Sequence, residues 1–356
     1  MRPTRFRLLG TALCTSFLLA ACGGSGDSAG TGNLTLGITD GPVESAQEVV
    51  VAFTGVEVKP ADGPALEPFL FEEGSCDSWD ETTGTCSINL LDVTGTDRRI
   101  IISEELAAGD YEWIRLLVDA DRNEVDSYLL TDAGEQCSLF VPSGAQTGLK
   151  LVSGFTVPVN GVTDYTLDFD LRKSITNPPG LTAPDVVDCT DDYLLKPAIR
   201  IVDNTQVGAI AGTVDAAQGS VLEQNCSADD ATGLYENLAV YVFEDPDGTV
   251  EPDDIDITDE TDVDPVTTAT VGWNETDQVY DYEVGFLLAP ASYRVALTCT
   301  ADLDDPEADD YTAGSADPQD FGFIAEQAVE VEVNTTADAS FQASSVIPGT
   351  VNSITD

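Results

Sequence analysis

Two aspartates in segment 165–172 have the spacing of a catalytic carboxylate pair. In an extended strand, Asp168 and Asp170 project from one face about 6.5–7 Å apart, near the carboxylate separation of an inverting glycosidase. A carboxylate-dependent glycan hydrolase is therefore one hypothesis. A general acid needs a raised pKa, however, and Arg172 on the same face predicts that both carboxylates stay ionised. We interpret the pair as a structural charge ladder and predict no catalytic residue.

Two acidic runs in the second half of the chain have the chemistry of a calcium site. One spans residues 253–264. The other holds six carboxylates in nine residues, namely Asp302, Asp304, Asp305, Glu307, Asp309 and Asp310. Calcium takes six to eight hard oxygen ligands, so Ca²⁺ is the one cofactor to consider. Neither run has a defined ligand spacing, and the favoured interpretation is a pair of solvated acidic loops without a cofactor.

One tryptophan is a candidate ligand contact. Trp79 lies in the short segment between Cys76 and Cys86, where a loop aromatic side chain could stack on a sugar. Trp113 follows Tyr111 at the start of an expected strand, and we expect it in the core.

Composition excludes several classes of protein. The 356 residues include 14 Lys and Arg, 65 Asp and Glu and no histidine, giving a net charge of −51. Without histidine there is no Ser-His-Asp or Cys-His catalytic arrangement and no His-ligated metal. The charge argues against nucleic acid as a partner, because phosphates are bound by clustered Lys and Arg. The sequence therefore favours a protein that is not an enzyme.

The cysteines predict a disulfide framework. Six of the eight lie beyond residue 22, and an even set without a CxxC pair or histidine favours disulfides over a metal site. Fifteen pairings are possible for six cysteines. Closeness in sequence favours Cys76–Cys86, Cys137–Cys189 and Cys226–Cys299.

The elements that must position these residues are short strands. Segment 165–171 alternates apolar and polar residues, and similar segments broken by Gly, Pro, Asn and Asp recur along the chain. This pattern predicts an all-β protein of two β-sandwich domains of immunoglobulin or transthyretin type. We place the first at 34–203, the second at 205–344 and a polar tail at 345–356. Segment 103–108 is expected to form one helical turn.

A weak internal repeat suggests that the two domains are related. Leu106–Tyr111 and Leu288–Tyr293 each read as a tight turn that ends in a tyrosine and continues into a strand. The step is similar to one found in transthyretin-like and carboxypeptidase-regulatory-type sandwiches.

The N-terminal sequence predicts where in the cell the protein is located. Three arginines precede a short apolar run, which is typical of a signal peptide over residues 1–21. The run ends in Leu19-Ala20-Ala21-Cys22, which resembles the lipobox of bacterial lipoproteins. The resemblance implies a lipid on Cys22 that anchors the protein to a membrane, and Gly23 at the following position favours the outer membrane. A flexible Gly/Ser linker is expected over 22–33.

The first domain resembles a bacterial lipoprotein family known as domain of unknown function 4382. The likeness rests on short sequence segments that occur in the same order as in the family and lie within about residues 34–203. They include Gly37–Val43, Asn89–Asp92, Asp168–Ile175 and Leu195–Ile201. It implies a β-rich envelope module, often followed by another sandwich, and brings no known activity.

Together these features predict a non-enzymatic, lipid-anchored outer-membrane protein that acts as a binding or structural interaction module. An envelope protein or a glycan is the expected partner. A calcium-dependent carbohydrate-binding or adhesion module and the glycan hydrolase remain the alternatives.

Overall fold

The computed structural model describes residues 30–41, 46–122, 124–142, 148–177, 189, 193–196, 198–258, 263–311 and 320–342. The signal-peptide prediction for 1–21, the lipid site Cys22 and the tail at 345–356 lie outside these residues. Within them, the α-helices have only four and five residues and the rest of the regular structure is mostly strand. The predicted all-β class is confirmed.

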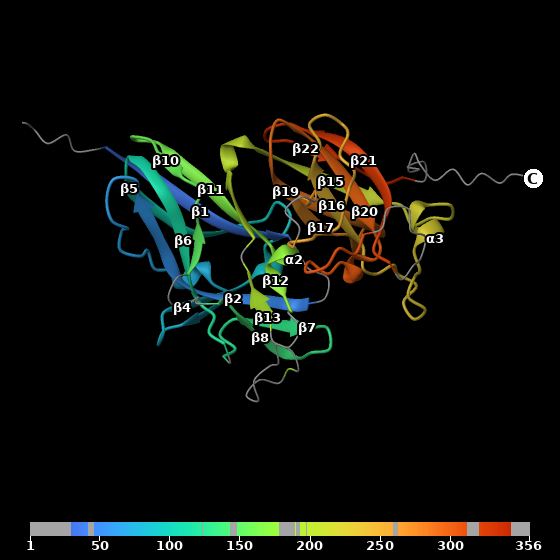
Figure 1. Ribbon diagram of the computed structural model, residues 1–356, viewed down its shortest axis with the longest axis horizontal. Helices are drawn as coiled ribbons and strands as arrows, with labels where there is room; N and C mark the ends of the chain where they lie inside the picture. The colour runs from blue at the N-terminus through green and yellow to red at the C-terminus, as the bar shows by residue number, and fades with distance from the viewer. Residues whose placement is uncertain are drawn as a thin grey trace, which may run out of the picture.

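The N-terminal domain, defined here as the described residues of 31–203, contains two sheets (Figure 1). One has the strand order β14-β11-β1-β5; the other has the order β10-β6-β2-β7-β8-β13-β12, with β3, β4 and β9 attached to it. Its elements are β1 (Thr31–Gly41), β2 (Ala46–Pro60), η1 (Glu73–Ser75), β3 (Ser78–Asp80), β4 (Thr85–Asn89), η2 (Leu90–Asp92), β5 (Arg99–Ala107), β6 (Gly109–Asp119), β7 (Tyr128–Thr131), β8 (Gln136–Phe140), β9 (Leu149–Leu151), β10 (Phe155–Val157), β11 (Val162–Asp170), α2 (Leu171–Ser174), β12 (Ile175–Thr176), β13 (Tyr193–Leu195) and β14 (Ile199–Asp203).

The C-terminal domain, defined here as the described residues of 207–341, is a smaller sandwich. Its sheets have the orders β18-β19-β15-β22 and β17-β16-β20-β21. Among the described strands, none pairs with a strand of the other domain. After the connecting turn η3 (Asn204–Gln206), the elements are β15 (Val207–Val214), α3 (Val221–Asn225), β16 (Ala239–Glu244), β17 (Thr267–Thr270), β18 (Gly272–Asn274), β19 (Val279–Leu288), β20 (Ala291–Thr298), η4 (Ala301–Leu303), β21 (Phe323–Val331) and β22 (Thr336–Asp338).

Each domain has a core between its two sheets. In the N-terminal domain the parallel pair β1 and β11 aligns Ile38 with Leu167, and both side chains are fully buried with Phe53 of the facing sheet. In the C-terminal domain, Ile210 of β15 is buried with Val240 and Val295 of the other sheet. Alternation of apolar side chains along each strand supplies these cores.

The internal repeat has a matching structure in the two domains. The Tyr111 hydroxyl donates to the Ala107 carbonyl at 2.9 Å, and the Tyr293 hydroxyl donates to the Leu288 carbonyl at 2.7 Å. Both tyrosines begin a strand just after the chain has crossed from one sheet to the other. A buried tyrosine bonded to a carbonyl a few residues upstream fixes such a crossing.

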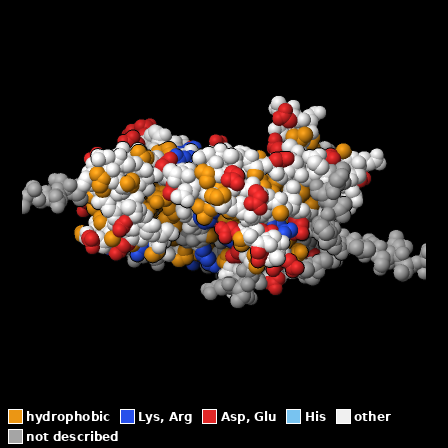
Figure 2. Space-filling view, turned by 90° about the horizontal axis from the view of Figure 1, so that it is seen from above, with side chains coloured by type: hydrophobic (Ala, Val, Ile, Leu, Met, Phe, Trp, Pro, Cys, Tyr) orange, Lys and Arg blue, Asp and Glu red, His pale blue; other side chains and the backbone are white. Residues whose placement is uncertain are grey.

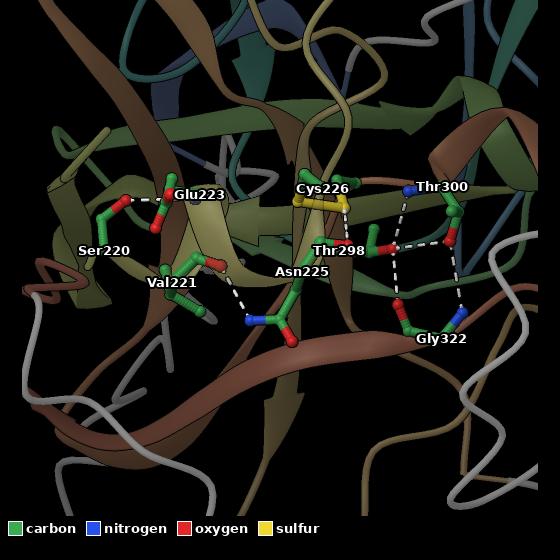
Figure 3. Close-up of a disulfide and its surroundings, with 9 residues drawn as sticks. Ser220, Val221, Glu223, Asn225, Cys226, Thr298, Thr300 and Gly322 are labelled. Carbon is green, nitrogen blue, oxygen red and sulfur yellow. Dashed lines mark hydrogen bonds between the residues drawn. A yellow bond between two sulfur atoms is a disulfide. The ribbon is translucent and has the colours of Figure 1, made fainter. Parts of the chain in front are cut away.

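The three locally favoured disulfides are present. They join Cys76 to Cys86, Cys137 to Cys189 and Cys226 to Cys299. The last joins α3 to the end of β20, as Figure 3 shows. Beside it, the Thr298 hydroxyl donates to the Gly322 carbonyl at 2.7 Å. This bridge and its neighbours fix the chain just before the acidic run at 302–310.

Two local expectations differ from the structure. Strand β1 begins at Thr31, so residues 31–33 lie in the sheet and not in the expected linker. The helical turn predicted over 103–108 is wrong, because residues through Ala107 belong to β5 and pair with β1. Burial of Ile101, Ile102 and Leu106 against the core outweighs the helix propensity of the intervening residues.

Candidate functional site

The predicted carboxylate pair lies at the contact between the two domains. Asp168 and Asp170 sit at the end of β11, and each is only 5% exposed. Burial raises the pKa of Asp168, although the adjacent Arg200 guanidinium opposes the rise. Burial also raises the pKa of Asp170 to about 6, opposed first by the charge of Lys173. The polar face of this strand is therefore enclosed, not solvated.

Arg172 does not continue the charge ladder. The strand ends at Asp170, whose carboxylate accepts a hydrogen bond from the Lys173 amide and caps the short helix α2. The helix turns Arg172 away, and Arg200 of β14 pairs with Asp168 instead. Our expectation that Arg172 holds both carboxylates ionised from the same strand face was wrong because the strand does not reach it.

A third carboxylate, not singled out from the sequence, joins this group. Asp40 near the end of β1 is 4% exposed, and neither of its carboxylate oxygens has a hydrogen-bond partner among the described residues. Burial, and then the charges of Asp168 and Asp170, raise the pKa of Asp40 well above its usual value. The segment Gly37–Val43 that carries the family resemblance includes this residue, but nothing in its spacing marks it as a candidate for chemistry.

The space beside these carboxylates is small. A cavity of about 10 Å³ is lined by Asp40 and Asp168 from one domain and by Thr267, Thr268 and Glu283 from the other. That volume holds about one water molecule. A sugar ring does not fit there, so the structure offers no support for a hydrolase using Asp168 and Asp170.

The two acidic runs meet and hydrogen-bond to each other. The Asp254 carboxylate accepts from the amides of Asp310 and Tyr311, at 2.5 and 3.1 Å. The Ile257 amide donates to the Pro306 carbonyl at 3.0 Å. Within the second run, Asp310 accepts from the Asp305 amide at 2.9 Å. Many of these carboxylates thus hold loop backbone in place.

Asp304 ties this pair of loops to the sheet below. Its carboxylate accepts from the Tyr241 hydroxyl at 2.5 Å and from the Ile255 amide at 3.3 Å. Burial raises the pKa of Asp304 to about 6. Asp254, Asp256 and Asp304 are all buried, which differs from the solvated loops expected from the sequence.

An apolar cluster lies beneath the acidic loops. Tyr241, Phe243, Ile255 and Phe321 are fully buried there, on the face of the β17-β16-β20-β21 sheet that points away from the main core. The sequence contained a signal for this packing, because Ile255 and Ile257 alternate with aspartates as in a half-buried strand.

Basic residues of the N-terminal domain reach these loops. Arg172, 4% exposed, donates to the Ala301 carbonyl at 2.8 Å and lies over the Tyr241 ring at 5.3 Å. In Figure 1 its helix α2 lies between the two halves of the molecule. The sequence did not predict this use of Arg172, because its partners are about 70 and 130 residues away in the chain.

Two lysines extend the same contact. The Lys173 ammonium lies 3.3 Å from an Asp264 carboxylate oxygen and donates to the Pro265 carbonyl at 2.6 Å. The Lys196 ammonium lies 3.1 Å from a Glu307 carboxylate oxygen. The acidic runs thus have cationic partners within the same chain.

The backbones also approach closely between the domains. A Cβ at Gly285 of β19 would lie 2.2 Å from the Gly95 carbonyl oxygen, and one at Gly41 would lie 3.1 Å from the Thr268 carbonyl oxygen. Since real Cβ atoms do not come as near as 2.2 Å, glycine is required at position 285. The Thr96 hydroxyl donates to the Glu283 carboxylate at 3.1 Å beside it.

Calcium stays a prediction. In the part of the chain that the structure describes, no group of three or more Asp, Glu, Cys or His is arranged to hold a metal ion. The same residues include no helix long and apolar enough to cross a membrane.

The candidate contact residue Trp79 is half-buried. It lies on β3 opposite Cys86 of β4 and packs against the N-terminal core. Trp113 is buried as expected. Two cationic groups lie over its ring, with the Arg115 guanidinium 4.6 Å and the Lys150 ammonium 4.9 Å from the ring centroid. A sugar-stacking role for Trp79 stays a prediction.

A groove of about 580 Å³ crosses the outer face of the β18-β19-β15-β22 sheet. Ala211 and Thr213 line it together with Asp281, Glu283 and Asp338. Within the described residues, none of these three carboxylates forms an ion pair with Lys or Arg. Arg294 is the only basic residue in the whole sequence between 205 and 356. Figure 2 shows the wider imbalance, with red side chains on both halves of the molecule and few blue ones.

Comparison with known proteins agrees with the resemblance seen in the sequence. Residues 31–197 match a family described as Domain of unknown function (DUF4382). No curated protein matches the chain.

Two solved structures are distantly similar. The shaft pilin SpaA from Lactobacillus rhamnosus GG is 10% identical with a TM-score of 0.16, and the alignment covers 88% of this chain and 98% of the pilin. The pilus adhesin SpaC from the same organism is 12% identical with a TM-score of 0.15, covering 88% of this chain and 43% of the adhesin.

Proposed function

We propose that the chain is a lipid-anchored, non-enzymatic protein of the bacterial outer membrane that acts as a binding or structural interaction module. The observation that carries the proposal is that the side chains most suggestive of catalysis or metal binding serve structural contacts. Asp168, Asp170 and Asp304 are enclosed at or beside the contact between domains, and Arg172 and Lys173 join the two sandwiches. These groups serve contacts within and between the domains.

The proposed address is supported by the lipobox-like segment ending at Cys22 and by three disulfides, which persist in exported proteins. Labelled palmitate should enter the wild-type protein but not Cys22→Ser. Cys14→Ser is the matched control, since Cys14 lies within the predicted signal peptide, and this variant should label normally. Equal labelling of Cys22→Ser would refute the anchor.

The proposed contact face is the groove over Ala211 and Thr213. Its carboxylates form no ion pair with Lys or Arg among the described residues, which favours a partner with a basic surface. A pull-down from intact envelopes should recover such a partner with the wild type and lose it with Asp281→Lys combined with Asp338→Lys. Glu104→Lys combined with Glu105→Lys, on exposed positions of β5, should retain it. Loss with both pairs, or with neither, would count against the groove.

The calcium-dependent alternative has its own test. A ligand that binds the folded state raises the melting temperature, so a rise with CaCl₂ that EDTA abolishes would favour it. A glycan array with and without calcium then tests a sugar ligand. Identical melts with calcium, magnesium and EDTA would discard this alternative.

A further inference from the structure

Asp40 is buried at the junction of the two domains without a counter-ion of its own. Its amide donates to the Val93 carbonyl at 2.9 Å, which fixes the backbone, but its carboxylate oxygens have no hydrogen-bond partner among the described residues. The next residue, Gly41, lies directly against Thr267 and Thr268 of β17. The strand end that carries Asp40 is thus a point of contact between the domains.

The charged groups around Asp40 give its carboxylate no cation, although the backbone amides of Leu171 and Gly41 favour its ionised form. From β11 it faces Asp168 and Asp170, whose charges oppose ionisation of Asp40. Arg200 of β14 is paired with Asp168, and Lys173 of α2 is engaged with Asp264 and Pro265.

The other elements packed around the cavity add no positive charge. Arg172 of α2 is directed to Ala301, and Arg98 of the 93–98 connection is paired with Asp164 at 2.7 Å. Strand β19 contributes Glu283 to the cavity wall, and β17 contributes Thr267, Thr268 and Ala269. Burying a further unpaired carboxylate in this setting is strongly unfavourable.

The cavity limits what can neutralise Asp40. It has room for about one water molecule or one ion. Among the described residues, no group of three or more Asp, Glu, Cys or His is arranged to hold a metal ion. A neutral carboxylic acid needs no extra space. We propose that Asp40 carries a proton in the assembled protein, and that its loss as the pH rises loosens the contact between β1 and β17.

The sign of the effect follows from linkage. Because burial and two neighbouring carboxylates raise the pKa of Asp40 in the folded protein, the folded state holds this proton more tightly than the unfolded chain. The stabilising contribution is complete below the unfolded value near pH 4. It declines as the pH rises towards the folded value, so alkaline conditions should open the domain contact first.

Asp40→Asn tests the proposal because an amide has the shape of the neutral acid and cannot ionise. Between about pH 5 and about pH 9, hydrogen-exchange protection of β17 amides, corrected for intrinsic rates, should fall about tenfold or more in the wild type. In Asp40→Asn the fall should be clearly smaller than in the wild type, and what remains comes from Asp168 and Asp170, whose pKa values are also raised. Asp62→Asn, at an exposed position, is the matched control and should behave as the wild type. Equal pH dependence in wild type and Asp40→Asn would overturn the proposal.

A second measurement does not depend on the variant folding. Near neutral pH, Asp170 and Asp304, with a pKa of about 6, are mostly ionised. Infrared spectra of the wild type should still show the carbonyl stretch of a protonated carboxylic acid there, and this band should disappear at alkaline pH together with β17 protection. Absence of that band at neutral pH would refute the proposal. Full restoration of β17 protection at alkaline pH by added Na⁺ or Ca²⁺ would also refute it, since a metal ion would then be the compensating group.

Discussion

The two domains share an architecture but differ sharply in charge. Each is a two-sheet sandwich with a buried tyrosine that bonds back to the turn before its strand. The segment 34–203 has 10 Lys and Arg against 31 Asp and Glu, whereas 205–344 has a single Arg against 32 acidic residues. The C-terminal domain therefore has almost no means of neutralising its own carboxylates.

This difference explains the direction of the contact between the domains. Arg172, Lys173 and Lys196 all come from the N-terminal domain, and their acceptors all lie at or near the acidic loops of the C-terminal domain. Arg294, the one base of the C-terminal domain, is used internally with Asp245 and Glu326. Lys173 and Lys196 of the N-terminal domain thus act as counter-ions for carboxylates of its neighbour.

The largest expected effects come from the disulfides, which close loops of different length in the two domains. Cys226–Cys299 spans 73 residues and Cys76–Cys86 spans 10. On the chain-entropy model, replacing the first pair by serines should lower the free energy of unfolding by about 4 kcal/mol, and replacing the second by about 3 kcal/mol. Urea unfolding of the two double variants measures both. A larger loss for the short loop would contradict this account.

Removing the buried cation should weaken the domain contact nearly as much. Arg172→Ala leaves the Ala301 carbonyl without its donor and exposes the Tyr241 ring, so we expect a loss of about 2–4 kcal/mol in the free energy of unfolding. Lys59→Ala removes a cation whose ion pair with Glu112 is internal to the N-terminal domain and partly exposed. It should cost less than about 1 kcal/mol. Equal losses in the two variants would show that Arg172 stabilises the contact between the domains no more than a partly exposed ion pair stabilises one domain.

The acidic loops should make stability pH-dependent. With its pKa raised to about 6 by burial, Asp304 binds its proton more tightly in the folded protein, so its stabilising contribution declines as the pH rises from about 4 to about 6. Asp304→Asn keeps an acceptor for Tyr241 but cannot ionise. Relative to wild type, the variant should gain up to about 2–3 kcal/mol between about pH 4 and about pH 7. The exposed neighbour substitution Asp302→Asn should show no such relative gain.

The shared tyrosine hydrogen bond offers a smaller test of the likeness between domains. Tyr111→Phe and Tyr293→Phe each leave a backbone carbonyl without its donor while preserving the ring. Each should cost about 1–1.5 kcal/mol in the free energy of unfolding. A loss confined to one domain would mean that the repeated motif has the same geometry but different energetic roles.

Local sequence patterns predicted the architecture better than the site. Alternation along 165–171 and the tyrosine repeat are properties of neighbouring residues, and the structure contains both. Proximity in sequence also selected the three disulfides. The helical turn at 103–108 failed because burial of Leu106 in a sheet is decided by the whole core.

The site was hidden because its parts are far apart in sequence. Asp40, Asp168 and Thr268 meet only after two domains have folded and packed, so no spacing could reveal the group. The many aspartates of the acidic runs predict solvated loops from the sequence alone. Their partners Lys173 and Lys196, and the underlying Tyr241, lie elsewhere in the chain.

Cations of the N-terminal domain hold the acidic loops of the C-terminal domain. A double-mutant cycle on Lys196 and Glu307 tests this claim most directly, because their ion pair joins the two domains through side chains alone. Lys196→Glu and Glu307→Lys should each destabilise the protein, and the combined exchange should recover about 0.5–1 kcal/mol of coupling in the free energy of unfolding. Strictly additive losses, with no recovery in the exchanged pair, would contradict the claim.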